Sequence, residues 1–527
     1  MMEAMTSRAY PDARVLQVWS SAPREGHELI AESTAPSLQD GSRSQSRILT
    51  WCVARRWPLL VWGAMVGWSL ALFTTARTAY ATFQLPRYDL GNMVQAVWST
   101  AHGRPLEVTH ATGEQSLRLA SHIDPILVLL APLWIVAPSP LTLAAVQIGA
   151  CALGALPVFW LGRRHLGSDR AAASMALAYL AYPWLAWTAI EALHPVTLAI
   201  PLLLFAVWFL DSGRLWAFAL CAVLAAATGE LLGLAIAGIG VWYWLARGHR
   251  RVGLGIAALG LAWTALAIKV LVPAFNEGDS PFYDRFASVG GSPGGLIKTA
   301  FTDPGAILSA LVTTDDLAYV LWLGLPLAGA FLLAPGLAAV GLPQLLVNML
   351  SDSAPTTDPR THYIAAIVPF LVAASVFGIA RLPSAHRVRA AAFVLALCVV
   401  LSTLAGQLLA VAGIKAPGYQ AELPRAHVDA LAAAAAVVPE GAPVSTTNRI
   451  GGHLSARRHV YSVPVLDRAE WIVLDTWDPR IAKTGSTILE WDPAAFQRFR
   501  SEIERGAGWI KVFERDGVLV FRKTGRP

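Results

Sequence analysis

Long stretches without any charged residue constrain this chain more than any other feature of its sequence. Residues 125–162 carry no charge over 38 positions, and residues 57–76 form a further uncharged run of 20. A helix of about 20 apolar residues can cross the hydrocarbon core of a bilayer. Charged residues make up only 14% of the 527-residue chain, whereas soluble domains contain roughly 25%. The sequence therefore predicts a membrane protein and excludes both a soluble globular domain and a wholly disordered chain.

Net charge and cysteine content exclude further classes of protein. The chain carries a formal net charge of +6, which is too small over this length to indicate nucleic acid binding. Its cysteines, Cys52, Cys151, Cys221 and Cys398, form no CxxC pair and no Cys/His cluster. We therefore expect neither a structural zinc site nor a disulfide framework.

The apolar runs predict eleven transmembrane helices within a multi-spanning domain over residues 51–413. These spans lie near 57–76, 141–161, 171–189, 195–210, 214–229, 231–246, 252–272, 318–333, 336–350, 364–381 and 388–413. Pro138-Ser139-Pro140 interrupts the uncharged run 125–162, so residues 125–137 are predicted to be an interfacial or re-entrant helix. Residues 1–50 are polar and are predicted to be a disordered tail without a cleavable signal.

The positions of arginine predict the orientation of the spans. Basic residues precede the first span and follow the second, fourth, sixth and tenth spans, so with eleven spans these five segments share one face. Cytoplasmic loops carry the excess of Lys and Arg, so this face and the N-terminus are predicted to be cytoplasmic. The opposite face then receives the long first loop 77–124, the loops 273–317 and 351–363, and everything after about residue 413.

Residues 414–527 are predicted to be a small extracytoplasmic α/β domain. Strand patterns occur at 443–447, 460–463 and 471–474, helix patterns at 431–438 and 450–458, and a hairpin pattern at 509–521. No Gly-rich phosphate loop or nucleophile elbow occurs among these residues. The predicted fold class is thus an all-α polytopic membrane protein with about eleven spans and a small C-terminal α/β domain.

Acids, histidines and isolated basic residues gather in the loops and span ends of the predicted outer face. They include Asp89, His122, Asp124, Glu191, His194, Glu230, Lys269, Arg360 and His362. Ionisable groups at membrane depth are costly and are by default candidates for function. The predicted inner loops, in contrast, are short and mostly contain arginine.

Several short motifs occur in order along this outer set. They are Tyr88-Asp89-Leu90-Gly91, Ser121-His122-Ile123-Asp124-Pro125, Leu193-His194-Pro195, Lys269-Val270-Leu271-Val272-Pro273 and His362-Tyr363-Ile364. Over roughly residues 57–480, the chain resembles the bacterial multi-spanning family called domain of unknown function 2079. This resemblance implies a plasma-membrane protein similar to the GT-C glycosyltransferase superfamily. Such proteins have a cytoplasmic N-terminus, an acidic residue in a long first outer loop, and a lipid-phosphate-linked sugar as donor.

Transfer of a sugar from a polyprenyl phosphate needs a base for the acceptor and stabilisation of the phosphate that is left behind. The resemblance favours Asp89 as the base, whereas the residues alone favour an N-cap of the helix predicted at 90–101. Glu191 and Glu230 are further candidate catalytic carboxylates, with turn residues at the outer surface as the alternative.

Six residues are candidates for substrate binding: Tyr88, His122, His194, Lys269, Arg360 and His362. Arginine can hold phosphate oxygens with a fork of two donors. Lys269 lies near the outer end of a predicted span, where extension of its amine to the interface is the alternative to a phosphate contact. His194 precedes a proline and could equally begin a helix.

A divalent metal is a further candidate ligand, held by Asp89, His122 and Asp124. The alternative for Asp124 is an N-cap followed by Pro125 at the first helical position. Asp315-Asp316 resembles a metal-binding pair, but the preceding Thr313 and Thr314 favour a helix start instead.

These observations predict an extracytoplasmic glycosyltransferase that moves a sugar from a polyprenyl phosphate to an envelope acceptor. Membrane lipid, the lipid-linked sugar and that acceptor are the predicted partners. A transporter or lipid flippase is the first alternative, because two short apolar runs flank Gly229-Glu230 and Lys269 lies within a span. A scaffold, in which the C-terminal domain binds a partner and the spans anchor it, is the second alternative.

Overall fold

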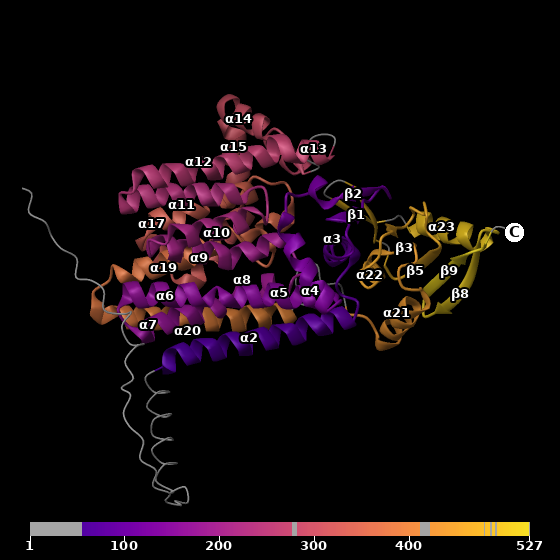
Figure 1. Ribbon diagram of the computed structural model, residues 1–527, viewed down its shortest axis with the longest axis horizontal. Coiled ribbons are helices and arrows are strands. Elements are labelled where there is room, and N and C mark those ends of the chain that lie inside the picture. Colours follow the sequence, from indigo (N-terminus) through magenta and orange to yellow (C-terminus); the bar gives the residue numbers. More distant parts are fainter. Residues whose placement is uncertain are drawn as a thin grey trace, which may run out of the picture. The chain divides into compact units, whose positions relative to one another are not determined.

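The computed structural model describes residues 55–276, 282–411, 422–478, 480–484, 487–490 and 493–525. Residues 57–527 form one compact unit, separate from residues 1–56. The predicted tail 1–50 and the predicted domain boundary near residue 414 lie outside the described residues. Most helices and strands of the compact unit are labelled in Figure 1.

Among the residues that the structure describes, four helical segments are long and apolar enough to cross a membrane: Arg56–Ala81, Pro140–Leu166, Arg250–Asn276 and Ser384–Gly406. The first is α2, and the second joins α5 (Pro140–Leu153) to α6 (Ala155–Leu166). The third joins α12 (Arg250–Leu266) to α13 (Val272–Asn276) through a π-helical turn, and the fourth lies in α20 (Ser384–Val411). These segments confirm the helical, membrane-spanning character that the uncharged runs predict.

The other predicted spans contain shorter or broken helices, so the count of eleven stays a prediction. These helices are α7 (Asp169–Leu180), α8 (Pro183–Ile190), α9 (Ala199–Asp211), α10 (Leu215–Ala226), α11 (Leu232–Arg247), α16 (Thr314–Gly324), α17 (Pro335–Ala338), α18 (Leu342–Met349) and α19 (Val368–Ala380). A proline begins α8 and α17 and lies in the first turn of α18 and α19, where its missing N–H costs no helical hydrogen bond. In the outer loop 273–317, α14 (Pro293–Thr302) and α15 (Pro304–Leu311) precede α16.

The uncharged run 125–162 breaks where its sequence predicts. A 3-10 turn, η3 (Pro125–Leu130), leads into α4 (Ala131–Val136), and α5 begins at Pro140. The Ser139 hydroxyl accepts a hydrogen bond from the Leu141 amide and so caps α5. Likewise, the Thr313 hydroxyl caps α16 by accepting from the Asp316 amide, which confirms the helix start predicted at Asp315-Asp316.

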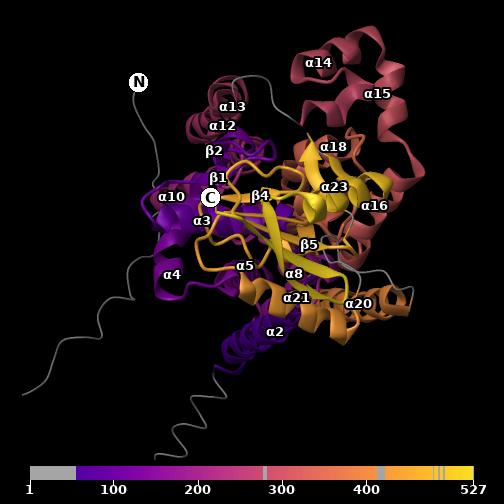
Figure 2. The same ribbon diagram turned by 90° about the vertical axis from the view of Figure 1, so that its right-hand side faces the viewer.

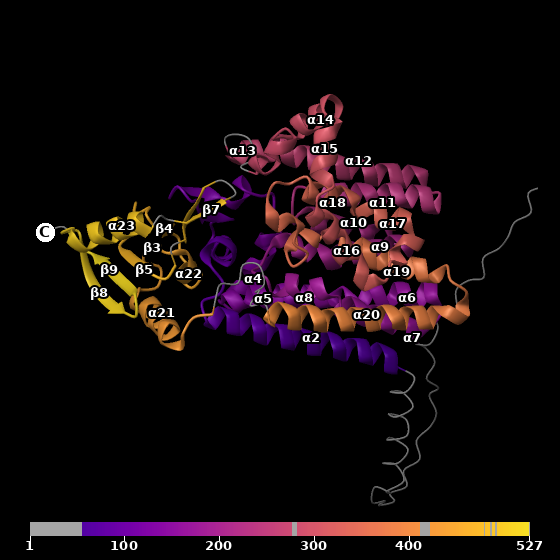
Figure 3. The same ribbon diagram turned by 180° about the vertical axis from the view of Figure 1, so that it is seen from behind.

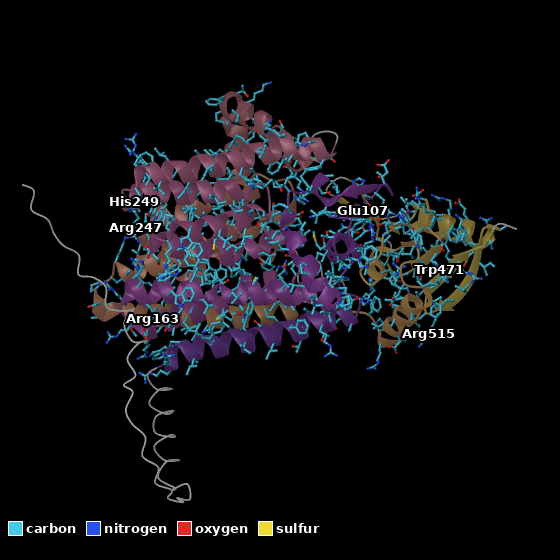
Figure 4. The ribbon with its side chains drawn as sticks, in the orientation of Figure 1. Glu107, Arg163, Arg247, His249, Trp471 and Arg515 are labelled. Atoms are coloured by element: carbon cyan, nitrogen blue, oxygen red, sulfur yellow. The ribbon has the colours of Figure 1, made fainter. Side chains whose placement is uncertain are left out.

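The ends of α6, α11 and α19 lie at one end of the helices (Figure 3), and basic residues from separate predicted inner loops meet there. The buried Asp211 carboxylate forms ion pairs with Arg164, His165 and Arg247. The Arg387 guanidinium donates to the His165 carbonyl, which adds the loop after α19. Four of the five segments predicted to share a face therefore lie together, and the fifth lies largely outside the described residues. Figure 4 labels Arg163, Arg247 and His249 at this end and Glu107 and Trp471 away from it.

The long first loop, which the sequence predicts to be outside, carries helix α3 (Asn92–Ala101) and a hairpin of β1 (Glu107–Thr109) and β2 (Gln115–Leu117). The C-terminal residues add a five-stranded sheet in the order β4-β3-β5-β9-β8. Its strands are β3 (Val444–Thr446), β4 (Val460–Ser462), β5 (Trp471–Asp475), β8 (Trp509–Arg515) and β9 (Val518–Lys523). β3 pairs in parallel with β4 and β5, whereas β9 runs antiparallel to β5 and β8.

Among the described residues, three helices accompany this sheet: α21 (Arg425–Val437), α22 (Asn448–Gly451) and α23 (Pro493–Arg505). Figure 2 labels α21 and α23 beside the sheet, and Figure 1 labels α22. A separate two-stranded sheet pairs β6 (Arg480–Thr484) with β7 (Thr487–Glu490). The sequence patterns predict the five strands of the main sheet and the second half of α21, but they miss α23, β6 and β7. The helix predicted at 450–458 is wrong beyond the short α22. We refer to residues 422–525 as the C-terminal module.

Candidate active site

Asp89 lies in a single π-helical turn, η1 (Arg87–Gly91), directly before α3. The N-cap residue of α3 is Gly91, and no side chain caps the helix, so the capping alternative for Asp89 is wrong. The Asp89 side chain is half-buried and makes no hydrogen bond or ion pair with any residue that the structure describes. Its carboxylate is therefore free to accept a proton, which a general base requires.

The C-terminal module holds the turn that carries Asp89. Arg87 is 1% exposed, and its Nη1 and Nη2 donate to Ser462 Oγ at 2.7 Å and to the Val460 carbonyl at 2.6 Å. The Tyr88 amide donates to Asn448 Oδ1 at 3.1 Å. Tyr88 itself is buried beside these contacts. Sequence reasoning missed Arg87 and Asn448 because their partners lie more than 350 positions away.

A second part of the site forms at the turn after α8. Gln147 on α5 is fully buried and fastens this turn, because its Nε2 donates to the Glu191 carbonyl at 2.7 Å and its Oε1 accepts from the His194 amide at 3.0 Å. Glu191 Oε2 accepts from the His362 amide at 2.8 Å, and its Oε1 lies 3.2 Å from His362 Nδ1. The rings of His194 and His362 stack with centroids 3.7 Å apart.

The surroundings of this cluster set its charge state. Burial raises the pKa of Glu191 to about 8, against an opposing effect of His194, and the nearby Asp89 charge adds to the increase. Burial and the neighbouring His362 lower the pKa of His194 to about 4. At neutral pH the Glu191 carboxyl is thus largely protonated and the His194 ring is neutral. Glu191 is therefore suited to donating a hydrogen bond at that pH.

Glu191, His194 and His362 could also hold a metal ion, because their ligand atoms lie within 4.8 Å of one another. One carboxylate and two imidazoles form a donor set typical of zinc sites. The two rings are nearly parallel, at 12°, so their in-plane lone pairs run side by side and one ring must turn before both can bind one ion. The predicted trio of Asp89, His122 and Asp124 is not brought together, because Asp124 pairs with Arg118 and His122 with Glu230.

The pair of His122 and Glu230 joins the first loop to the turn between α10 and α11. His122 Nδ1 lies 3.1 Å from Glu230 Oε1, and the Ile123 amide donates to Glu230 Oε2 at 3.2 Å. Burial opposes ionisation of Glu230, but His122 and the backbone donors outweigh it and lower the pKa of Glu230 to about 2. Because Glu230 stays ionised and paired, it holds the loop and is a weak base.

His194 and His362 of the second part face one cavity of about 460 Å³ with mostly apolar walls. Tyr88, Asp89 and Glu191 are not among the residues that line it. The predicted residues that line it are His122, Asp124, His194, Glu230 and His362. Lys269 is exposed in the π-helical turn η5 (Ala267–Leu271), and neither it nor Arg360 lines the cavity. The Arg360 Nε and Nη2 atoms both donate to the Asp358 carboxylate, at 2.6–3.1 Å.

Arg285, and not the predicted substrate-binding residue Arg360, is the arginine that lines this part of the cavity wall. Its Nη1 donates to the Tyr363 hydroxyl at 2.6 Å, and its guanidinium lies 4.8 Å from the centre of the Phe282 ring. Among the described residues, no carboxylate forms an ion pair with it, and its buried Nε has no hydrogen-bond partner. Its position in the outer loop 273–317 is the one sequence signal that could have identified it.

Comparison with known proteins places the chain in a family. A family model described as "Predicted membrane protein (DUF2079)" matches residues 79–520. The chain belongs to this family. The DUF2079 motifs quoted above include Asp89, His122, His194 and His362, all within the matched residues. Comparison with curated proteins gave no match.

Two solved structures resemble the DUF2079 chain in fold. Both are of ArnT, a GT-C glycosyltransferase, from Cupriavidus metallidurans. The structure bound to undecaprenyl phosphate has a TM-score of 0.51 at 12% identity, and the match covers 89% of this chain and 98% of ArnT. The apo structure has a TM-score of 0.46 at 14% identity, with 86% and 98% covered. At this identity the likeness to the structure bound to undecaprenyl phosphate shows the fold alone, which is ArnT-like.

Proposed function

We propose that this protein transfers a sugar from a polyprenyl phosphate to an envelope acceptor on the outer side of the plasma membrane. The main observation in support of this proposal is that ionisable residues from five predicted outer segments meet around one mostly apolar cavity. The segments contain His122, the Glu191–His194 turn, Glu230, Arg285 and His362. An apolar cavity with few polar groups suits an isoprenoid chain that ends in a phosphate. The undecaprenyl phosphate bound to ArnT supports this class of ligand.

Each group then has a role that its surroundings support. Asp89, the carboxylate without a partner, accepts the proton of the attacking acceptor hydroxyl. The Arg285 guanidinium stabilises the negative charge that develops on the phosphate oxygens as the sugar leaves. The protonated Glu191 and the histidines stacked beside it donate hydrogen bonds to the sugar or phosphate. Where a divalent metal binds, Glu191, His194 and His362 would hold it, and it would neutralise phosphate charge.

The test compares Asp89→Asn with Asp315→Asn, an exposed acid at the start of α16. Purified variants in nanodiscs receive polyprenyl-phosphate-linked sugars, and a deletion strain that carries each variant is assayed for envelope glycans. We expect Asp89→Asn to bind the donor and to lose transfer by about 10²- to 10⁴-fold, the contribution typical of a positioned base. Asp315→Asn should behave as wild type.

Full repair of the glycan defect by Asp89→Asn would overturn the assignment of the base. Movement of a lipid-linked sugar across proteoliposome membranes without transfer to an acceptor would favour the transporter alternative. Normal envelope glycans in a strain that carries a chain lacking residues 422–527 would count against the scaffold alternative, which depends on the C-terminal module.

A further inference from the structure

A hollow of about 760 Å³ opens at the basic end of the helices, where the predicted inner loops meet. We call it the basic hollow and define it by Arg163, Arg164 and Arg214 with the aromatic residues Trp160, Trp208 and Phe209. None of these residues lines the cavity of the candidate active site. The proposed transfer reaction therefore does not account for the basic hollow.

Acidic neighbours hold two of the three arginines in place without covering them. Arg163 Nε lies 2.8 Å from Asp169 Oδ1, and Arg164 Nε lies 3.1 Å from Asp211 Oδ2. The side chains of both arginines are still about half exposed, at 53% and 52%. Fixed guanidiniums lose less side-chain entropy when they bind an anion.

The charge of the hollow exceeds what its acids can neutralise. Arg214 is exposed and makes no side-chain hydrogen bond or ion pair with the described residues. Arg247 adds a fourth guanidinium at Asp211, so four cations face two carboxylates. The first residue of α7 lies at the rim, and the Ser168 hydroxyl caps that helix. A helix N-terminus adds a partial positive charge to the same place.

The surface beside the hollow is apolar. Arg214 directly precedes α10, which exposes 75% of Trp216, 54% of Leu220 and 66% of Val223. Inside the hollow, the rings of Trp160 and Trp208 pack with centroids 5.7 Å apart. Tryptophan is enriched where the acyl chains of a bilayer meet its head groups. The basic hollow therefore lies where an apolar, lipid-facing helix surface ends.

We propose that the basic hollow binds the head group of an anionic phospholipid, such as phosphatidylglycerol or cardiolipin. The guanidiniums bind the phosphate oxygens, and the acyl chains lie along the exposed face of α10. Basic pockets between helices on the cytoplasmic side of a membrane characteristically bind such head groups. One phosphate shared by Arg163 and Arg214 would tie the last turn of α6 to the loop before α10.

The test measures which lipids the purified full chain retains, by native mass spectrometry after exchange into mixtures of phosphatidylglycerol and phosphatidylcholine. The double variant Arg163→Gln/Arg214→Gln leaves Arg164 with Asp211, and melting temperatures in detergent check its fold. We expect it to lose preference for phosphatidylglycerol by about ten- to thirtyfold, at roughly 1 kcal/mol for each arginine. The control Arg251→Gln/Arg389→Gln removes equal charge from exposed residues outside the hollow and should keep the preference.

A second variant, Arg214→Glu, changes one exposed side chain and should reduce the preference even if the double variant does not fold. Equal loss in the hollow and control variants would overturn the proposal, as would equal retention of the two lipids by wild type. Displacement of phosphatidylglycerol by equimolar soluble glycerol phosphate would assign the site to a free phosphate and would also overturn it. None of these experiments measures sugar transfer, so their result on lipid binding is independent of the proposed function.

Discussion

Three carboxylates of the site, predicted from the same kind of sequence signal, differ because of what surrounds them. Glu230 is paired with His122 and has a pKa lowered to about 2. Glu191 is buried beside the neutral ring of His194 and has a pKa raised to about 8. Asp89 is half-buried without a partner among the described residues. In the proposed reaction, these surroundings make Glu230 a structural anion, Glu191 a hydrogen-bond donor and Asp89 the base.

The buried Glu191 predicts a dependence of stability on pH that a single variant should remove. Its pKa rises from 4.5 to about 8 on folding, so the folded protein holds more protons and stability falls as pH rises toward 8. The lowered pKa of His194 acts oppositely, but only between about 4 and 6.5. Between pH 6.5 and 8, the change in stability therefore reports the titration of Glu191 without that of His194.

We expect the melting temperature of wild type to fall between pH 6.5 and 8. The melting temperature of Glu191→Gln should fall less, because the amide is neutral at every pH. Thermal unfolding in detergent at a series of pH values measures the difference. Glu114→Gln, an exposed acid in the first loop, is the control and should follow wild type. Parallel curves for wild type and Glu191→Gln would contradict the raised pKa.

At the scale of elements, α11 and α12 touch through glycines two turns apart. Gly233 and Gly240 on α11 face Gly260 and Gly253 on α12, and a Cβ added to Gly260 would lie 2.4 Å from the Gly233 carbonyl oxygen. Small residues allow membrane helices to approach closely, and van der Waals packing then holds them together. The two helices therefore form a close pair at the side of the cavity that carries Glu230.

Gly260→Ala should destabilise the protein by about 1–3 kcal/mol because the new methyl group forces the backbones apart. Gly255→Ala is the matched control, because the same helix has open space there and alanine favours helix by up to about 1 kcal/mol. Melting temperatures of both variants in one detergent give the comparison. Equal effects at the two positions would contradict the close packing.

The contact between the first loop and the C-terminal module gives a second prediction at this scale. Arg87→Met removes a buried guanidinium and leaves the Val460 carbonyl and the Ser462 hydroxyl without their donor. We expect a cost of about 2–4 kcal/mol, faster hydrogen exchange in η1, and reduced transfer with donor binding kept. Arg458→Met is the control, because its exposed ion pair with Glu107 is worth at most about 1 kcal/mol. Similar exchange rates in both variants would contradict a positioning role.

At the scale of the whole molecule, the structure separates two ends with different chemistry. One end gathers arginines around Asp211, and the other gathers Asp89, Glu191, His362 and the contact with the C-terminal module. At each end, the loops that meet are loops that the eleven-span prediction places on the same face of the membrane. The assignment of the arginine-rich end to the cytoplasm stays a prediction from the distribution of charge.

Labelling of single cysteines tests this orientation. In a chain with Cys52→Ser, the remaining cysteines Cys151, Cys221 and Cys398 are buried. We expect a membrane-impermeant maleimide to label Glu114→Cys and Gly508→Cys in intact cells, and Arg251→Cys only after permeabilisation. Reversal of all three results would invert the orientation, and opposite results for Glu114→Cys and Gly508→Cys would contradict the contact between the first loop and the C-terminal module.

The sequence alone determined the membrane character, the helix breaks and the family of this protein. Uncharged runs, prolines and caps such as Ser139 and Thr313 act through neighbours a few residues away, so their effect is local and can be predicted. The distribution of arginine also indicated which loops share an end. The side of the membrane on which a loop lies depends on the charge of that loop itself, which is again a local property. Motifs such as Tyr88-Asp89 and His362-Tyr363 pointed to residues that the structure brings to the site.

Only the tertiary structure decided which ionisable residues act together. Arg360 is held by its neighbour Asp358, while Arg285 reaches the cavity, and no local pattern distinguishes these two arginines. The hydrogen-bond partners of Glu191 and Glu230 lie 171 and 108 positions away in the sequence. Burial and charge from such distant segments shift the pKa values of the two carboxyl groups in opposite directions. Desolvation and pairing depend on packing between distant segments, so the chemistry of each carboxylate is a property of the folded chain.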